Sequence, residues 1–119
     1  MAAKAYALLP PHFRDLCGNL LIRVEDFPSR EVLDEMKARS EFDLLGLFQG
    51  IGLVQEGAIQ PTGRLPNMIF LYRRPILDYW AEHRETLGAI VTHVLVHEIG
   101  HHFGLSDADM ERIEREAAP

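Results

Sequence analysis

The chain has 119 residues, of which 47% are hydrophobic and 25% are charged, and its formal net charge is −6. This length fits one domain, which we expect to span residues 1–119, and the apolar content is enough for one core and argues against disorder. The acidic balance, without a stripe of lysines and arginines, argues against binding to nucleic acid.

The first part of the chain predicts two short helices with a strand between them. Residues 10–18, PPHFRDLCG, are typical of a short helix that begins at its prolines and ends at its glycine. Residues 19–27, NLLIRVEDF, are rich in leucine, isoleucine and valine and predict a strand. Ser29 is then a suitable N-cap for a helix over residues 30–39, which carry an apolar stripe.

The middle of the chain predicts strands and a loop. Residues 44–59, LLGLFQGIGLVQEGAI, are apolar but glycine-rich, which favours a short, bent strand pair over a helix. Residues 59–67, IQPTGRLPN, contain two prolines and a glycine and predict a loop. Residues 67–74, NMIFLYRR, are β-branched and aromatic and predict a further strand.

The last part of the chain predicts helices. Residues 75–85 open with a proline and have an apolar side that includes Trp80, so we expect a helix that buries this side. Residues 86–103 are ambiguous, because their β-branched residues favour a strand while their apolar spacing favours a helix, which we expect. Gly104 can end that helix, and Ser106 can begin another. This order of elements predicts an α+β fold.

Cysteine content and the N-terminus bear on where the protein works. Cys17 is the single cysteine, so an intrachain disulfide is impossible and a reducing compartment fits. The stretch MAAKAYALLPP has an apolar run too short for a secretory signal, and no other stretch approaches a membrane span. We therefore expect a cytoplasmic protein that does not bind membranes, and the sequence leaves its oligomeric state open.

The stretch HEIGHHFGLSD, residues 97–107, carries the strongest functional signal. On a helix, His97 and His101 lie on one face a turn apart, and both imidazoles can reach a single zinc ion at about 2.0–2.1 Å. Glu98 is rotated from His97 by about 100°. Its carboxylate can therefore take a proton from a metal-bound water without being a ligand itself.

A catalytic zinc usually has three protein ligands and one open position, so a third ligand is needed. Gly104 permits a sharp chain reversal after His101, and Asp107 can then return to the same ion. An acid placed directly after an N-cap serine also stabilises the helix dipole, which leaves other carboxylates open as the third ligand. These alternatives are Asp109, Glu111 and Glu114, of which Glu114 is the most interesting because it lies on a neighbouring helix turn.

Several other residues near the motif have two possible roles. His93, one turn before His97, either supports the ligands or is an ordinary residue of the helix surface. Met110 either forms the floor of the metal site or is a core methionine. A phenol or a cation beside the metal could stabilise the oxyanion of a tetrahedral intermediate. The candidates for that role are Tyr72, Tyr79, Arg73 and Arg74.

The full pattern, His97-Glu98-x-x-His101-x-x-Gly104-x-x-Asp107, resembles the metzincin signature HExxHxxGxxH with its last histidine replaced. It also resembles a family of very short, mostly bacterial zincin-like metallopeptidases that carry HExxHxxGxxD, and the stretches LLGLFQG and IFLYRRPI share in this resemblance. The resemblance implies a minimal zincin-like fold: a small mixed sheet packed on the motif helix, with helices before and after it and an edge strand that pairs with an extended peptide. It also implies Zn²⁺ bound by His97, His101 and Asp107, with Glu98 as the general base.

We therefore expect a zinc-dependent metalloprotease or peptidase that hydrolyses peptide bonds in extended peptide or protein substrates, with weak or regulated activity. Other divalent transition metals also suit a site of two nitrogens and one oxygen. One alternative is a non-catalytic metal-binding module, with a peptide-binding or regulatory role, on the same scaffold. A second alternative is a metal-dependent hydrolase of substrates other than peptides.

Overall fold

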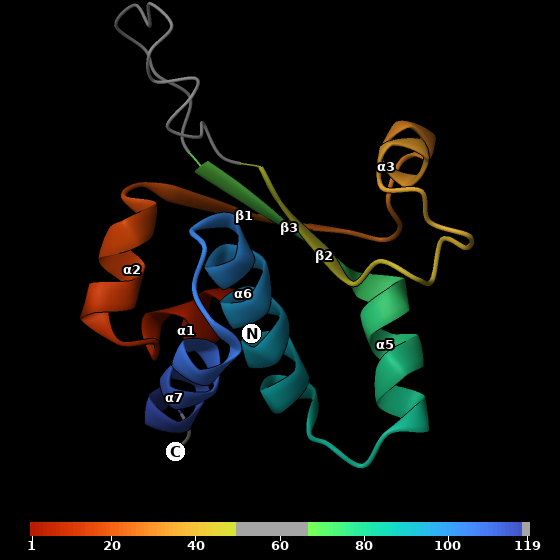
Figure 1. The fold of residues 1–119 in the computed structure, drawn as a ribbon. Coiled ribbons are helices and arrows are strands. Elements are labelled where there is room, and N and C mark those ends of the chain that lie inside the picture. Colours follow the sequence, from red (N-terminus) through yellow and green to blue (C-terminus); the bar gives the residue numbers. More distant parts are fainter. Residues whose placement is uncertain (50–66, 118–119) are drawn as a thin grey trace, which may run out of the picture.

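A computed structural model describes residues 1–49 and 67–117 of the chain. Helices and strands are interspersed along the first part, and helices follow the last strand (Figure 1). The elements are α1 (Ala2–Ala7), α2 (Pro11–Cys17), β1 (Leu20–Glu25), α3 (Arg30–Glu35), β2 (Gly46–Gln49), β3 (Asn67–Tyr72), α5 (Arg73–Glu82), α6 (Leu87–His102) and α7 (Asp107–Ala117).

The strands form one small mixed sheet in the order β1-β3-β2. β1 runs parallel to β3, with Leu20 opposite Asn67, and β2 runs antiparallel to β3, with Gly46 opposite Leu71. β3 is the central strand and alternates in burial, since Ile69 is wholly buried. β2 therefore lies at an edge of this sheet, where one side of its backbone is not paired with another strand of the described residues.

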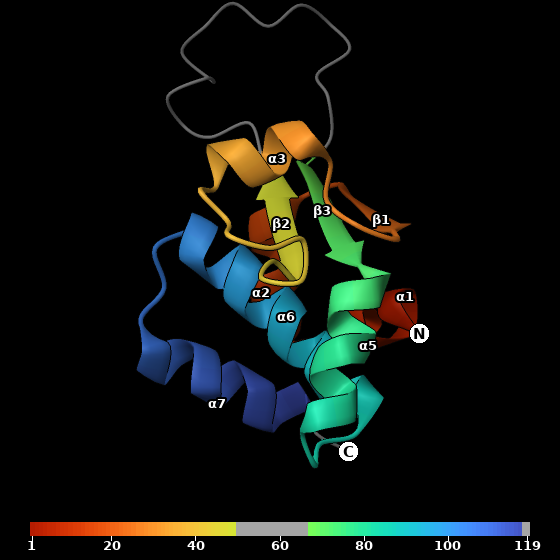
Figure 2. The same ribbon diagram turned by 90° about the vertical axis from the view of Figure 1, so that its right-hand side faces the viewer.

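Helix α6 packs against the sheet and is the centre of the core. It contacts β2, β3, α1, α5 and α7. Figure 1 shows α6 and α7 on one side of the sheet and α3 on the other, and Figure 2 shows α6 passing beneath β2. Its buried residues face in several directions, as expected for a helix surrounded by other elements. They are Ile90, Val91, Val94, Leu95, Val96, Ile99 and Gly100.

The ends of α6 are fixed by local hydrogen bonds. At its start, the Thr86 Oγ1 accepts a hydrogen bond of 3.1 Å from the backbone N–H of Ala89, which is N-capping. At its end, the N–H of Leu105 donates to the carbonyl of Gly100 over 2.9 Å, and Gly104 adopts a φ of 75°. This is a Schellman motif, for which a left-handed glycine is favoured. These caps explain why the β-branched stretch forms a helix in this context.

The fold confirms the α+β class and the small mixed sheet packed on the motif helix. The helices at residues 10–18, 86–103 and after Ser106 are confirmed, as is the strand at residues 19–27. The helix expected over residues 30–39 is shorter, since α3 ends at Glu35.

Other expectations about the elements need correction. Helix α1 was not predicted; its alanines have high helix propensity, and Ala5 packs into the core. Helix α5 begins at Arg73, two residues before the predicted start, because a proline within the first helical turn forfeits no helical hydrogen bond. The expected burial of Trp80 is wrong, since it is 44% exposed.

Part of the predicted strand pair over residues 44–59 is confirmed by β2. The rest of that pair and most of the loop at residues 59–67 lie outside the described residues. In the described part of the chain, none of the helices is long and apolar enough to cross a membrane.

Candidate metal centre

Three histidines follow one another at four-residue spacing along one face of α6: His93, His97 and His101. The rings of His93 and His97 are stacked with centroids 3.9 Å apart. The rings of His97 and His101 are nearly perpendicular, with centroids 5.6 Å apart. His97 is thus the middle member of the row, and it has an imidazole neighbour on each side.

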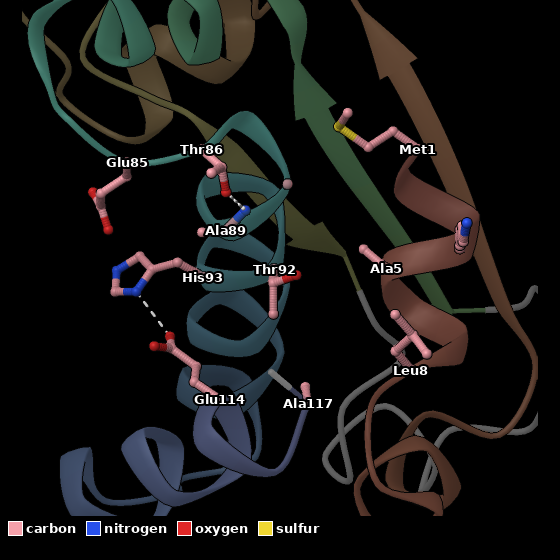
Figure 3. A pocket seen from close by; sticks show the side chains of 12 residues that line it. Met1, Ala5, Leu8, Glu85, Thr86, Ala89, Thr92, His93, Glu114 and Ala117 are labelled. Carbon is pink, nitrogen blue, oxygen red and sulfur yellow. Dashed lines mark hydrogen bonds and ion pairs between the residues drawn. The ribbon is translucent and has the colours of Figure 1, made fainter. Parts of the chain in front are cut away.

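Glu114 of α7 meets the first two histidines of this row. Its Oε1 lies 2.8 Å from Nδ1 of His93 and 3.1 Å from Nε2 of His97. Figure 3 shows the side chains of His93 and Glu114 pointing toward one another from the two helices. Among the described residues, these three form the one set of histidine, cysteine or acidic side chains whose ligand atoms all lie within 4.8 Å of one another.

The Glu114 oxygen fits a cation better than it fits an ordinary hydrogen bond. Oε1 is buried, and no group in the described part of the chain donates a hydrogen bond to it in acceptable geometry, although two imidazole nitrogens lie beside it. A buried carboxylate oxygen without a donor is costly. Two imidazole nitrogens and one carboxylate oxygen are a donor set that suits Zn²⁺ and other divalent transition metals.

The ionisation of His97 favours metal ligation. Burial lowers the pKa of His97 below its ordinary value, and the neighbouring charge of His93 lowers it further, whereas the carboxylate of Glu114 acts in the opposite direction. The ring is therefore neutral at neutral pH. A neutral imidazole offers a lone pair to a metal ion, which the protonated ring cannot do.

The contact between α6 and α7 brings Glu114 to the histidines. A Cβ atom on Gly100 would lie only 2.5 Å from the Sδ and 2.8 Å from the Cγ of Met110, so α7 approaches α6 closely because Gly100 has no side chain. Met110 is 0% exposed and belongs to the core. Glu114 lies one helical turn after Met110 on the same face of α7. The position of the carboxylate therefore follows from the packing of Met110.

Glu98 lies on the side of α6 that faces the sheet. A Cβ atom on Gly46 of β2 would lie 3.5 Å from the Cγ of Glu98 and 2.7 Å from the Cγ1 of Val94. Burial raises the pKa of Glu98, and the charge of His101 opposes that rise. Glu98 is thus a half-buried carboxylate between the motif helix and the edge strand.

The motif residues differ in how the structure places them. His101 is an exposed residue beside His97 near the C-terminal end of α6. Asp107 is the exposed first residue of α7. Its charge weakly opposes the lowering of the His97 pKa, but its carboxylate is not part of the close set of ligand atoms. The ligand set of His97, His101 and Asp107 therefore stays a prediction, as does the role of Glu98.

Among the candidates for oxyanion stabilisation, Tyr72 is the one whose charge environment includes Glu98. Burial raises the pKa of Tyr72, and the carboxylates of Glu25 and Glu98 add to this, so its phenol keeps its proton. The other candidates that have contacts interact elsewhere: Arg73 pairs with Asp26 at 2.8 Å, and Tyr79 stacks on His83 at 3.7 Å.

Two residues of this centre carry more weight in the structure than the sequence suggested. His93 was interpreted mainly as a surface residue, and Glu114 only as one of three alternatives for the third ligand. The signal available for His93 was its four-residue spacing from His97. For Glu114 it was the four-residue spacing from Met110, which places both on the core-facing side of α7.

Comparison with known proteins adds an independent finding. Residues 17–117 match the family model of zincin-like metallopeptidases, which is most of the chain and includes the whole of α6 and α7. The chain matches no curated protein.

Proposed function

Because the chain belongs to the zincin-like metallopeptidase family, we propose that it is a zinc-dependent peptidase in which Glu98 is the general base. One observation supports this assignment most strongly. The half-buried Glu98 lies beside His101 on the side of α6 that faces edge strand β2, so a base adjoins both a predicted metal ligand and a possible peptide-binding edge.

The proposed catalytic ligands are His97, His101 and Asp107. The two histidines are one helical turn apart, and their ring centroids are 5.6 Å apart. Residues one turn apart on a helix can place two imidazoles on a single zinc ion. Asp107 lies where the chain turns back after Gly104, and its charge already influences His97.

In this proposal Zn²⁺ supplies a Lewis acid that polarises the scissile carbonyl and activates a water molecule. Glu98 accepts the proton of the attacking water on its carboxylate and returns it to the nitrogen of the leaving amine. The raised pKa of Glu98 makes its carboxylate a stronger base than an exposed glutamate. The protonated phenol of Tyr72 is available to donate a hydrogen bond to the developing oxyanion.

The substrate would bind as an extended peptide beside β2. Because β2 ends the order β1-β3-β2 among the strands of the described residues, the outer side of its backbone is open to another extended chain within that part of the structure. Figure 2 shows β2 above α6, so a peptide on this edge would run close to the motif helix. Backbone pairing gives affinity without strict selection of side chains, which favours a loose sequence preference.

The non-catalytic alternative is favoured by a different observation. His93, His97 and Glu114 are the residues whose ligand atoms already lie together, and Glu98 is not one of them. A metal ion held by this set alone would have a structural or regulatory role. The chain would then bind peptides, if at all, without cleaving them.

Glu98→Gln tests the proposed chemistry. The variant removes the base but no ligand, so we expect it to keep the zinc content of the wild type while peptide hydrolysis falls by about 100-fold or more. Hydrolysis is measured on a pool of internally quenched peptides, and zinc by elemental analysis of the same samples.

Glu116→Gln is the matched control, because Glu116 is an exposed residue of α7 outside the proposed site. It should keep both hydrolysis and zinc. Undiminished turnover in Glu98→Gln would contradict the role of Glu98, and a wild-type protein that binds zinc but cleaves no peptide of the pool would favour the non-catalytic alternative.

A further inference from the structure

His97 stands between two groups of possible ligands. On one side are His93 and Glu114. The Oε1 of Glu114 lies 2.8 Å from Nδ1 of His93 and 3.1 Å from Nε2 of His97. On the other side is His101, whose ring centroid lies 5.6 Å from that of His97, and Asp107 follows at the start of α7. His93 and His101 are each four residues from His97, so both pairs have the same helical relation.

We propose that His93, His97 and Glu114 form a second metal position that competes with the catalytic position for His97, so that an ion bound there leaves the peptidase inactive. This inference rests on the proposed function for its inhibitory consequence, whereas the second metal position itself does not depend on it. The ligand class is a divalent transition-metal ion such as Zn²⁺ or Co²⁺.

The competition follows from the chemistry of one imidazole ring. A neutral imidazole has a single nitrogen with a free lone pair, since its other nitrogen carries the proton. In the close set it is Nε2 of His97 that faces Glu114. An ion in the catalytic position that binds this lone pair leaves the second position without His97, and the reverse also holds. His97 can therefore bind only one ion at a time.

An ion in the second position is displaced from the general base. The two pairs of histidines are offset by four residues, which is roughly 6 Å along the helix axis. The Cγ of Glu98 would lie 3.5 Å from a Cβ atom on Gly46 of β2, whereas the Glu114 carboxylate reaches the row from α7 and lies 2.8 Å from His93. Glu98 thus faces the sheet, whereas the second position faces α7.

The second position also has its own access to solvent. His93 and Glu114 line a pocket of about 490 Å³ between α1, the start of α6 and the end of α7. Figure 3 shows both side chains on one side of this pocket and Met1, Ala5 and Leu8 on the other. An ion could enter from here without passing edge strand β2, and a route of entry is one requirement of a metal site.

Cobalt binding to variants of the whole chain tests this proposal. His101→Ala removes a ligand of the catalytic position and leaves the second position intact. We expect this variant to bind one equivalent of Co²⁺, measured by equilibrium dialysis and by the visible absorption of the bound ion. Asp107→Asn also removes a proposed ligand of the catalytic position and leaves the second position intact, so it should bind Co²⁺ in the same way. Both residues are exposed, and thermal unfolding verifies that the variants are folded.

Adding Glu114→Gln to His101→Ala should weaken Co²⁺ binding at least about 10-fold, because one of three ligands is lost. The control, Glu116→Gln in the same background, should change the affinity less than twofold. Folded single variants that bind no Co²⁺, or an unchanged affinity after Glu114→Gln, would overturn the proposal. Neither the Co²⁺ stoichiometry nor the affinity depends on turnover. A wild-type protein that binds metal but is inactive would therefore contradict the proposed peptidase function and not the second metal position.

Discussion

The two halves of the histidine row on α6 are specified in different ways. At the His101 end, the proposed ligands, the proposed base and the chain reversal all lie within residues 97–107, so local spacing predicts them. At the His93 end, the carboxylate comes from Glu114 on another helix and reaches the row through the contact of Met110 with Gly100. Sequence spacing therefore defines one half of the centre, and helix packing defines the other.

His97→Ala should produce the largest effect, because this residue belongs to both halves. Neither the set with His101 and Asp107 nor the set with His93 and Glu114 would keep more than two ligands. We expect zinc content, measured by elemental analysis after dialysis, to fall from about one equivalent to near zero.

The matched control is His12→Ala, which removes an exposed histidine of α2 and should leave zinc content unchanged. If His97→Ala kept a full equivalent, the ion would bind elsewhere and the comparison between the two halves would lose its basis.

Met110→Ala should affect the Glu114 half of the centre, because it changes the packing of α7 on α6. Met110 is fully buried, so truncation should lower the free energy of unfolding by about 2–5 kcal/mol, as measured by urea denaturation. Because Met110 positions α7, Co²⁺ binding by the Glu114 set should also weaken, even though no ligand is changed.

Met36→Ala is the control for truncation of a methionine, because Met36 is 48% exposed. We expect it to change the free energy of unfolding by less than about 0.5 kcal/mol. Equal effects of the two substitutions would mean that Met110 does not hold α7 against α6.

The same division explains how much could be predicted from sequence. The motif helix was expected over residues 86–103 and runs from Leu87 to His102, because its cap residues and apolar spacing are local signals. The α+β class followed from the order of elements. The family match over residues 17–117 agrees with the resemblance carried by the motif.

What the sequence did not reveal depends on tertiary contacts. The proximity of Glu114 to His93 requires Gly100 and Met110 to pack together, and no local pattern states which helix faces of α6 and α7 will meet. The burial of Trp80 was wrong for a related reason: α5 turns its Pro75 and Ile76 into the core instead. The predicted ligand Asp107 lies at the surface, where spacing alone does not determine its orientation.

Ser106→Ala should produce the smallest change in the free energy of unfolding. It tests the start of α7, the helix that carries both Asp107 and Glu114. The Oγ of Ser106 accepts a hydrogen bond of 3.1 Å from the N–H of Asp109 and caps the start of α7. Loss of such a cap should lower the free energy of unfolding by about 1 kcal/mol. The first turn of α7, which carries Asp107, should loosen more than the turn with Glu114, since Met110 holds the helix between them.

The control is Ser29→Ala, which removes the equivalent hydrogen bond of 3.2 Å to Val32 at the start of α3. None of the residues of α3 is buried in the described structure, so its first turn can fray with little effect on the core. Ser29→Ala should therefore cost less than Ser106→Ala in urea denaturation. If both variants cost the same, the first turn of α7 would matter no more to stability than the first turn of α3, and the expected coupling of the α7 cap to the core would be wrong.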